Sequence, residues 1–114
     1  MIEDLPPDQF EKLSELQYPI DVRITNELIM SIPDTWNVIK LEVDVIWHPN
    51  YLELGYAITS PEGRDASKAK PNDALKAAVE EMVRLHKSFG QELSKVTSIA
   101  KQDADGWEMD TDYK

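Results

Sequence analysis

Residues 37–60 read NVIKLEVDVIWHPNYLELGYAITS, and this stretch decides the fold. Apolar and polar residues alternate over 37–48, which places the apolar side chains on one face of a strand. Pro49-Asn50 predicts a turn, and residues 51–60 continue the alternation. The stretch therefore predicts an antiparallel hairpin with one buried and one solvated face. The residues expected on the buried face are Ile39, Leu41, Val43, Val45, Trp47, Leu52, Leu54, Tyr56 and Ile58.

Two helices are expected before this hairpin. Residues 8–17, DQFEKLSELQ, begin with capping-box spacing and carry apolar residues at helical intervals. Pro19 predicts an interruption, because the residue before a proline avoids the helical conformation. A second helix is expected over at least 22–31, and Pro33-Asp34 predicts its end.

The second half of the chain predicts one more helix and a second hairpin. Asn72 is the expected N-cap of the helix, and the Asp-Gly sequence at 105–106 predicts the hairpin turn. The expected elements are a polar loop at 61–71, a helix at 73–89, a strand at 93–101, a DADG turn at 103–106 and a strand at 107–113.

The elements together predict one α+β domain spanning residues 1–114, in the order α-α-β-β-α-β-β. A four-stranded antiparallel sheet is expected, with the helices packed on one face. Trp36, Trp47 and Trp107 are expected in the core, because buried aromatics dominate core packing. The other face of the sheet is expected to be acidic and to carry Glu42, Asp44, Glu53, Glu108, Asp110 and Asp112.

The charge balance restricts the partners. The chain of 114 residues has 12 Lys and Arg against 22 Asp and Glu, which gives a formal charge of −10. Nucleic acids and anionic membranes are not expected partners, because both are bound by neutralising phosphates with basic side chains. The charge favours either simple solubility or attraction of a basic protein.

Composition also bears on the compartment. There are no cysteines, which excludes disulfides, thiol catalysis and cysteine-based zinc sites. No apolar run reaches the ~18 residues of a membrane span, and the N-terminus has no signal-peptide pattern. We therefore expect a cytoplasmic protein.

Three stretches of the sequence carry residues that could form a chemical site. The DADG turn at 103–106 fails as a calcium loop, because Lys101 stands where the metal needs an anion. His48 and His86 are the candidates for acid–base chemistry, but nothing in the sequence brings them together. Asp110 and Asp112 share a strand face, where a glycosidase needs carboxylates that flank a cleft. No catalytic, metal-binding or cofactor-binding residue is predicted.

With these elements placed, the chain resembles the YezG-like family of immunity proteins. The likeness lies in IPDTW at 32–36, MVRLHKSFG at 82–90 and SKVTSIAKQDADGWEMDTDYK at 94–114, and it covers roughly residues 22–114. It implies a non-enzymatic protein that protects bacteria from a cognate toxin of a polymorphic or contact-dependent inhibition system. The implied partner is a nuclease-type toxin domain, and the complex is expected to be 1:1.

An acidic sheet face fits a basic toxin groove independently of that resemblance. Tyr51 and Ile46 are candidate apolar anchors on this face. The alternatives are docking on the helices or on the 61–71 loop, an adaptor or secretion chaperone, and a small histidine-dependent nuclease or hydrolase. The expected toxin-binding residues are Glu42, Asp44, Tyr51, Glu53, Glu108, Asp110 and Asp112.

Overall fold

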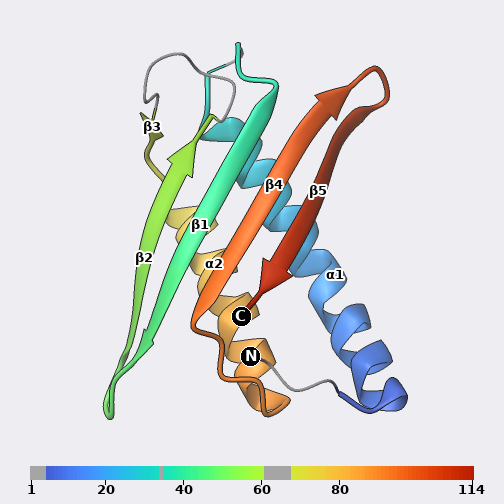
Figure 1. The fold of residues 1–114 in the computed structure, drawn as a ribbon, viewed down its shortest axis with the longest axis vertical. Helices are drawn as coiled ribbons and strands as arrows, with labels where there is room; N and C mark the ends of the chain where they lie inside the picture. Colours follow the sequence, from blue (N-terminus) through green and yellow to red (C-terminus); the bar gives the residue numbers. More distant parts are fainter. Residues whose placement is uncertain (1–4, 34, 61–67) are drawn as a thin grey trace.

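The computed structural model describes residues 5–33, 35–60 and 68–114. Within these residues the chain forms α1 (Pro7–Met30), β1 (Val38–Trp47), β2 (Leu52–Thr59), β3 (Lys68–Ala69), α2 (Asp73–Ser88), β4 (Lys95–Asp103) and β5 (Gly106–Tyr113). The strands form one antiparallel sheet in the order β3-β2-β1-β4-β5. Figure 1 shows both helices on the same side of this sheet.

The α+β class, the two long hairpins and the one-sided packing of the helices are confirmed. The four long strands are the expected ones, and the two-residue β3 adds a short edge beside β2. The prediction of a loop over 61–71 is therefore wrong at Lys68 and Ala69, which pair with Thr59 and Ile58. Its residues 61–67 lie outside the described part of the chain, as does Asp34.

The predicted interruption of the first helix is wrong, because α1 runs through Pro19 without a break. Proline cannot donate a hydrogen bond to the carbonyl one turn earlier, which belongs to Glu15. Both residues are exposed, so water can bind that carbonyl. The opposite face of α1 holds the helix in place through buried side chains, namely Leu13, Gln17, Ile20, Ile24 and Leu28.

The core lies between the helices and the inner face of the sheet. Ile39, Leu41 and Val43 of β1 are almost fully buried there, as the alternation predicted. The helix α2 begins as expected, with the Leu75 backbone N–H donating to Asn72 Oδ1 at 2.7 Å. Trp36 is buried in the core, whereas Trp47 and Trp107 are partly buried at its margin.

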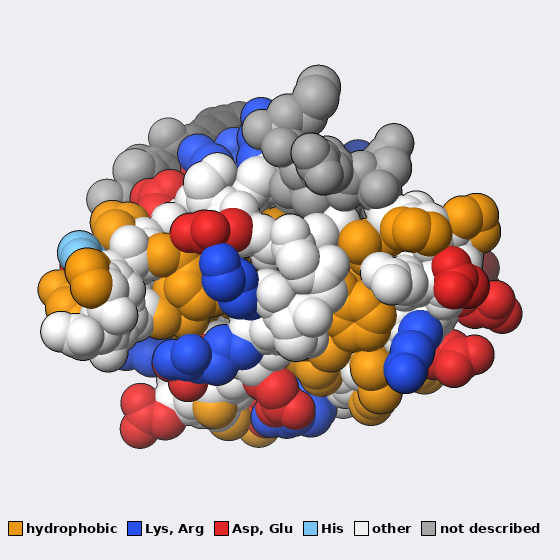
Figure 2. Space-filling model, turned by 90° about the horizontal axis from the view of Figure 1, so that it is seen from below, with side chains coloured by type: hydrophobic (Ala, Val, Ile, Leu, Met, Phe, Trp, Pro, Cys, Tyr) orange, Lys and Arg blue, Asp and Glu red, His pale blue; other side chains and the backbone are white. Residues whose placement is uncertain are grey.

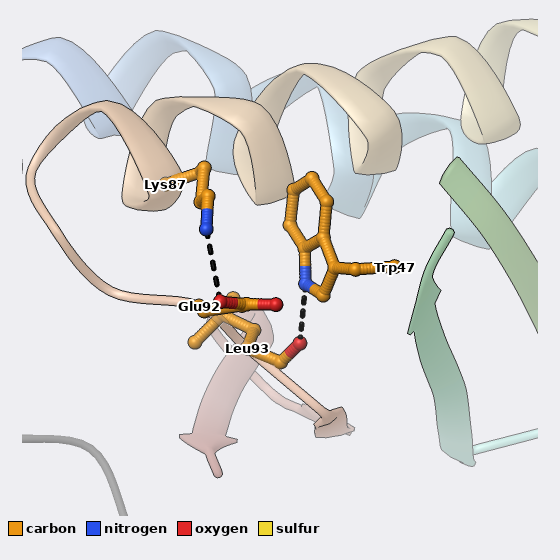
Figure 3. A network of polar contacts seen from close by, with 4 residues as sticks. All are labelled: Trp47, Lys87, Glu92 and Leu93. Atoms are coloured by element: carbon orange, nitrogen blue, oxygen red, sulfur yellow. Dashed lines mark hydrogen bonds and ion pairs between the residues drawn. The ribbon is translucent and has the colours of Figure 1, made fainter. Parts of the chain in front are cut away.

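Trp47 joins the end of β1 to the loop between α2 and β4 (Figure 3). Its indole Nε1 donates to the Leu93 carbonyl at 2.9 Å. The Nζ atom of Lys87 lies 5.2 Å from the Trp47 ring centroid and 2.9 Å from Glu92 Oε2. These contacts fix the entry into β4, which starts at Lys95 rather than at the expected residue 93.

The second hairpin turns at Ala104 and Asp105, between the paired residues Asp103 and Gly106. Asp103 Oδ1 accepts a hydrogen bond from the Asp105 backbone N–H at 2.8 Å. Gly106 has a φ of 124°, a conformation that side chains with a Cβ rarely adopt. The turn thereby sets the register of β5 against β4.

Candidate functional site

Figure 1 looks onto the face of the sheet that neither described helix covers. We call this the outer face. The inner-face residues of β1 are buried and the residues between them are partly or fully exposed, so the strand alternates as predicted. The same alternation in β5 exposes every second residue. The six predicted acids therefore all lie on the outer face, spread over three strands: Glu42, Asp44, Glu53, Glu108, Asp110 and Asp112.

The outer face also carries lysines that the sequence interpretation left out. β4 lies between β1 and β5 and contributes Lys95 and Lys101 to this face. Glu42 is held by two of the lysines, with Oε1 3.2 Å from Lys40 Nζ and Oε2 3.2 Å from Lys95 Nζ. The hydrogen bond from Lys95, followed by that from Lys40, lowers the pKa of the Glu42 carboxyl. A partner's cation would have to compete with both lysines for Glu42.

The acidic character is strongest along β5. Asp110 lies opposite Ile99 and Asp112 lies opposite Thr97, so their direct neighbours on β4 are uncharged. Glu108 lies opposite Lys101. We call Glu108, Asp110 and Asp112 the acidic edge, because β5 is the last strand on this side of the sheet.

A second group of predicted residues lies at the turn between β1 and β2. Tyr51 is 60% exposed and stacks on His48 with 4.2 Å between the ring centroids. His48 Nε2 lies 3.0 Å from Glu53 Oε1, and the neighbouring Ile46 is 45% exposed. Figure 2 views this end of the molecule and shows a histidine beside hydrophobic side chains. We call these four residues the turn cluster.

The turn cluster and the acidic edge do not form one compact patch. β2 and β5 are separated by β1 and β4, which puts Glu53 and the acidic edge about 14 Å apart across the sheet. The two groups are also displaced along the strands, because Glu53 lies opposite Ile46 whereas Asp112 is level with Glu42, four residues or about 14 Å away. One protein partner can cover both, because interfaces of ordinary size are wider than this. A small ligand cannot.

The two histidines lie in different contact networks. His48 belongs to the exposed turn cluster, whereas His86 of α2 is buried against α1 and β5. His86 Nε2 lies 2.6 Å from Gln17 Oε1, and Nδ1 lies 2.8 Å from Gln91 Oε1. Gln17 Nε2 in turn donates to the Tyr113 hydroxyl and to Asp21 Oδ1, the latter at 3.1 Å.

Burial shifts the ionisable groups of this inner network. Desolvation lowers the pKa of His86, while Gln91 and Asp21 act in the opposite direction. Desolvation also raises the pKa of Asp21 and raises that of Tyr113 to about 12. In each case burial favours the neutral form, which is the behaviour of polar groups that support packing.

A groove runs between α1 and β5 on the inner side of the sheet. It has a volume of about 480 Å³ and is lined by Tyr18, Asp21, Val22, Thr25 and Asn26 of α1 and by Trp107, Met109, Asp110, Thr111 and Tyr113 of β5. Tyr18 and Val22 are 71% and 42% exposed. Sequence reasoning missed this groove, because Tyr18 was expected to lie between two helices and Val22 at the start of the second.

Neither a metal centre nor a membrane span emerges from the described residues. Within them, no three His, Asp or Glu side chains are grouped so as to hold a metal ion. No helix in the same part of the chain is long and apolar enough to cross a membrane. No family model and no curated protein matches the sequence.

Proposed function

We propose that the protein is an immunity protein that binds a basic toxin domain of the nuclease type and neutralises it without catalysis. The observation that carries the proposal is the acidic edge beside a sheet face left open by both described helices. The expected setting is the cytoplasm and the expected stoichiometry is 1:1. The resemblance to YezG-like immunity proteins supports the same function.

The charge pattern would act first on the rate of association. Asp110 and Asp112 face uncharged neighbours on β4 and can therefore attract Lys or Arg side chains that would otherwise hold phosphate. Such attraction raises the association rate and weakens as salt screens it. Glu42 contributes less, since two lysines already hold its carboxylate.

The turn cluster would supply the tight part of the interface. Tyr51 presents an aromatic ring that His48 supports from one side, and Ile46 adds apolar surface. Aromatic residues buried at the centre of an interface commonly carry most of the binding energy. Asp44 would then lie between the anchors and the acidic edge, while Glu53 would border the anchors on the β2 side.

The test uses a basic nuclease toxin domain that co-purifies with this chain, and calorimetry measures its affinity at two salt concentrations. The triple variant Glu108→Lys, Asp110→Lys, Asp112→Lys should lose affinity by about a hundredfold or more. The matched control Asp8→Lys, Glu11→Lys, Glu15→Lys changes the net charge equally on the exposed start of α1. Equal losses of affinity in both variants would mean that net charge alone explains the effect. No loss of affinity in either variant would rule out the acidic edge as the toxin-binding surface.

An adaptor or secretion chaperone is the second candidate, and the α1–β5 groove favours it. Exposed Tyr18 and Val22 offer apolar surface to an unfolded client. Such a protein would bind several clients with similar affinity, whereas an immunity protein binds one toxin domain. A histidine-dependent nuclease gains no support, because His48 and His86 lie in separate networks.

A further inference from the structure

The backbone of β5 on the side away from β4 is open to a further strand. The Lys114 N–H donates to the Lys95 carbonyl at 2.9 Å, and the Lys95 N–H donates back at 3.2 Å. Bonded and non-bonded pairs alternate along an antiparallel ladder, so the next bonded pairs involve Asp112, Asp110 and Glu108. The N–H and C=O groups of Trp107, Met109, Thr111 and Tyr113 therefore point away from β4. In the described part of the chain, β5 is the outermost strand on this side.

The same four residues turn their side chains toward α1 and line the α1–β5 groove. Tyr18 and Val22 form the other side of the groove and are largely exposed. A strand added to β5 would place every second side chain into this groove. Apolar side chains would fit there, because they would cover Val22, Met109 and the three aromatic rings of the groove, which belong to Tyr18, Trp107 and Tyr113.

The remaining side chains of an added strand would lie next to the acidic edge. A second copy of β5 would place carboxylates beside carboxylates, which destabilises pairing. Lys or Arg at those positions would instead meet Glu108, Asp110 and Asp112. The edge thus discourages self-association and favours a strand with one basic face and one apolar face.

We propose that the β5 edge and the α1–β5 groove form a docking site for an extended segment that alternates apolar and basic residues. The segment joins the sheet as an antiparallel strand beside β5. The proposal shares the acidic edge with the proposed function, but it does not depend on the partner being a toxin. It also requires the open backbone of β5 and the inner groove, so the methylated peptides and Thr111→Pro test it separately from toxin binding through the outer face.

The probe is the acetylated and amidated peptide KVKVKVKV, titrated into the full chain and followed by amide NMR shifts. The shifts should change in β5 and in the 18–26 segment of α1. In an antiparallel pairing the valines face the groove and their N–H groups bond β5. N-methylation of the valines should weaken binding about tenfold or more, while N-methylation of the lysines should leave it within about threefold. Equal effects of the two modifications would overturn strand addition.

Charge is tested with the peptide EVEVEVEV, which should show no measurable binding. Equal binding of the two peptides would overturn the assignment of a basic segment. Light scattering could instead reveal a stable dimer of the free protein that substitutions in β5 disrupt. That result would identify a second copy as the occupant and would likewise overturn the assignment of a basic segment.

The protein side is tested at Thr111, whose N–H points to the open edge. Thr111→Pro removes this donor without removing a bond to β4, and Thr111→Val keeps it. Both variants lose the 2.9 Å contact between the Thr111 and Ser98 hydroxyls, so they are matched in that respect. Only Thr111→Pro should abolish peptide binding, and retention of binding would overturn the proposal. If Thr111→Pro fails to fold by circular dichroism, the methylated peptides still decide the question.

Discussion

His86 Nε2 in α2 lies 2.6 Å from Gln17 Oε1 in α1, and the same glutamine reaches the Tyr113 hydroxyl in β5. One amide side chain thus connects both helices to the last strand of the sheet. Both imidazole nitrogens face amide oxygens, Gln17 Oε1 and Gln91 Oε1, so a neutral ring with one N–H can donate to only one of them. A protonated ring would add a charge to a place that burial has desolvated.

The protein should therefore lose stability as the pH falls below about 6.5. Burial lowers the pKa of folded His86 from 6.5, so the unfolded chain binds more protons just below that pH. The free energy of unfolding then decreases until the pH passes the folded pKa. Urea unfolding between pH 8 and pH 5.5 measures this slope.

The comparison with His86→Gln isolates the contribution of His86. Asp21 acts with the opposite sign, since its raised pKa makes the folded state bind a proton first, but both proteins contain it. Gln91 and Tyr113 are likewise present in both. Identical slopes for the wild type and His86→Gln would contradict the prediction.

Pro19→Ala should stabilise the protein by about 1–3 kcal/mol, because alanine restores a backbone donor in the interior of a helix. The exposed position of Pro19 leaves room for the change. Pro7→Ala is the control, since Pro7 is the first residue of α1 and has no intrahelical bond to restore. Chemical denaturation of the three proteins measures the difference, and a Pro19→Ala variant less stable than the wild type would contradict the prediction.

Trp47→Phe should destabilise the fold by about 1–2 kcal/mol, because the Leu93 carbonyl loses its indole donor. Lys87→Met removes the cation above the Trp47 ring and the ion pair with Glu92. That variant should cost less than about 1 kcal/mol, since both charged groups of the pair are half-exposed. Thermal and urea unfolding would show the order of the two effects, and a reversed order would contradict it.

Neutralising single acids should separate the acidic edge from the centre of the sheet. Asp110→Asn should weaken binding of a basic toxin domain by about three- to tenfold, because no lysine lies opposite Asp110 on β4. Glu42→Gln should change affinity less, because Lys40 and Lys95 already hold that carboxylate. Association rates measured at low salt would show the difference most clearly, and a larger effect of Glu42→Gln would refute this ranking.

Local patterns predicted the elements well where side-chain periodicity was strong. The hairpin of β1 and β2 followed from strict alternation, and the start of α2 followed from Asn72. The break at Pro19 was wrong, because tertiary packing of Ile20 and Ile24 outweighs one missing hydrogen bond. Neighbouring residues alone could not reveal this.

The candidate site was less predictable, since it depends on which strands are neighbours. The inner face of β4 carries Val96, Ser98 and Ala100, a mixed and small set that left its direction open. Lys95 was therefore not expected beside Glu42. The groove was missed for a related reason, because it exists only once α1 and β5 lie next to each other.

The two-residue turn at Ala104 and Asp105 has a consequence for how this surface can change. Side chains alternate strictly along a strand, so one inserted residue would send the carboxylates of β5 into the core and turn Trp107 and Met109 outward. The length of this turn therefore determines whether β5 presents its acidic side chains or its apolar side chains on the outer face. Substitutions on β5 can diversify partner choice gradually, whereas a change in the length of this turn would exchange the two faces in a single step.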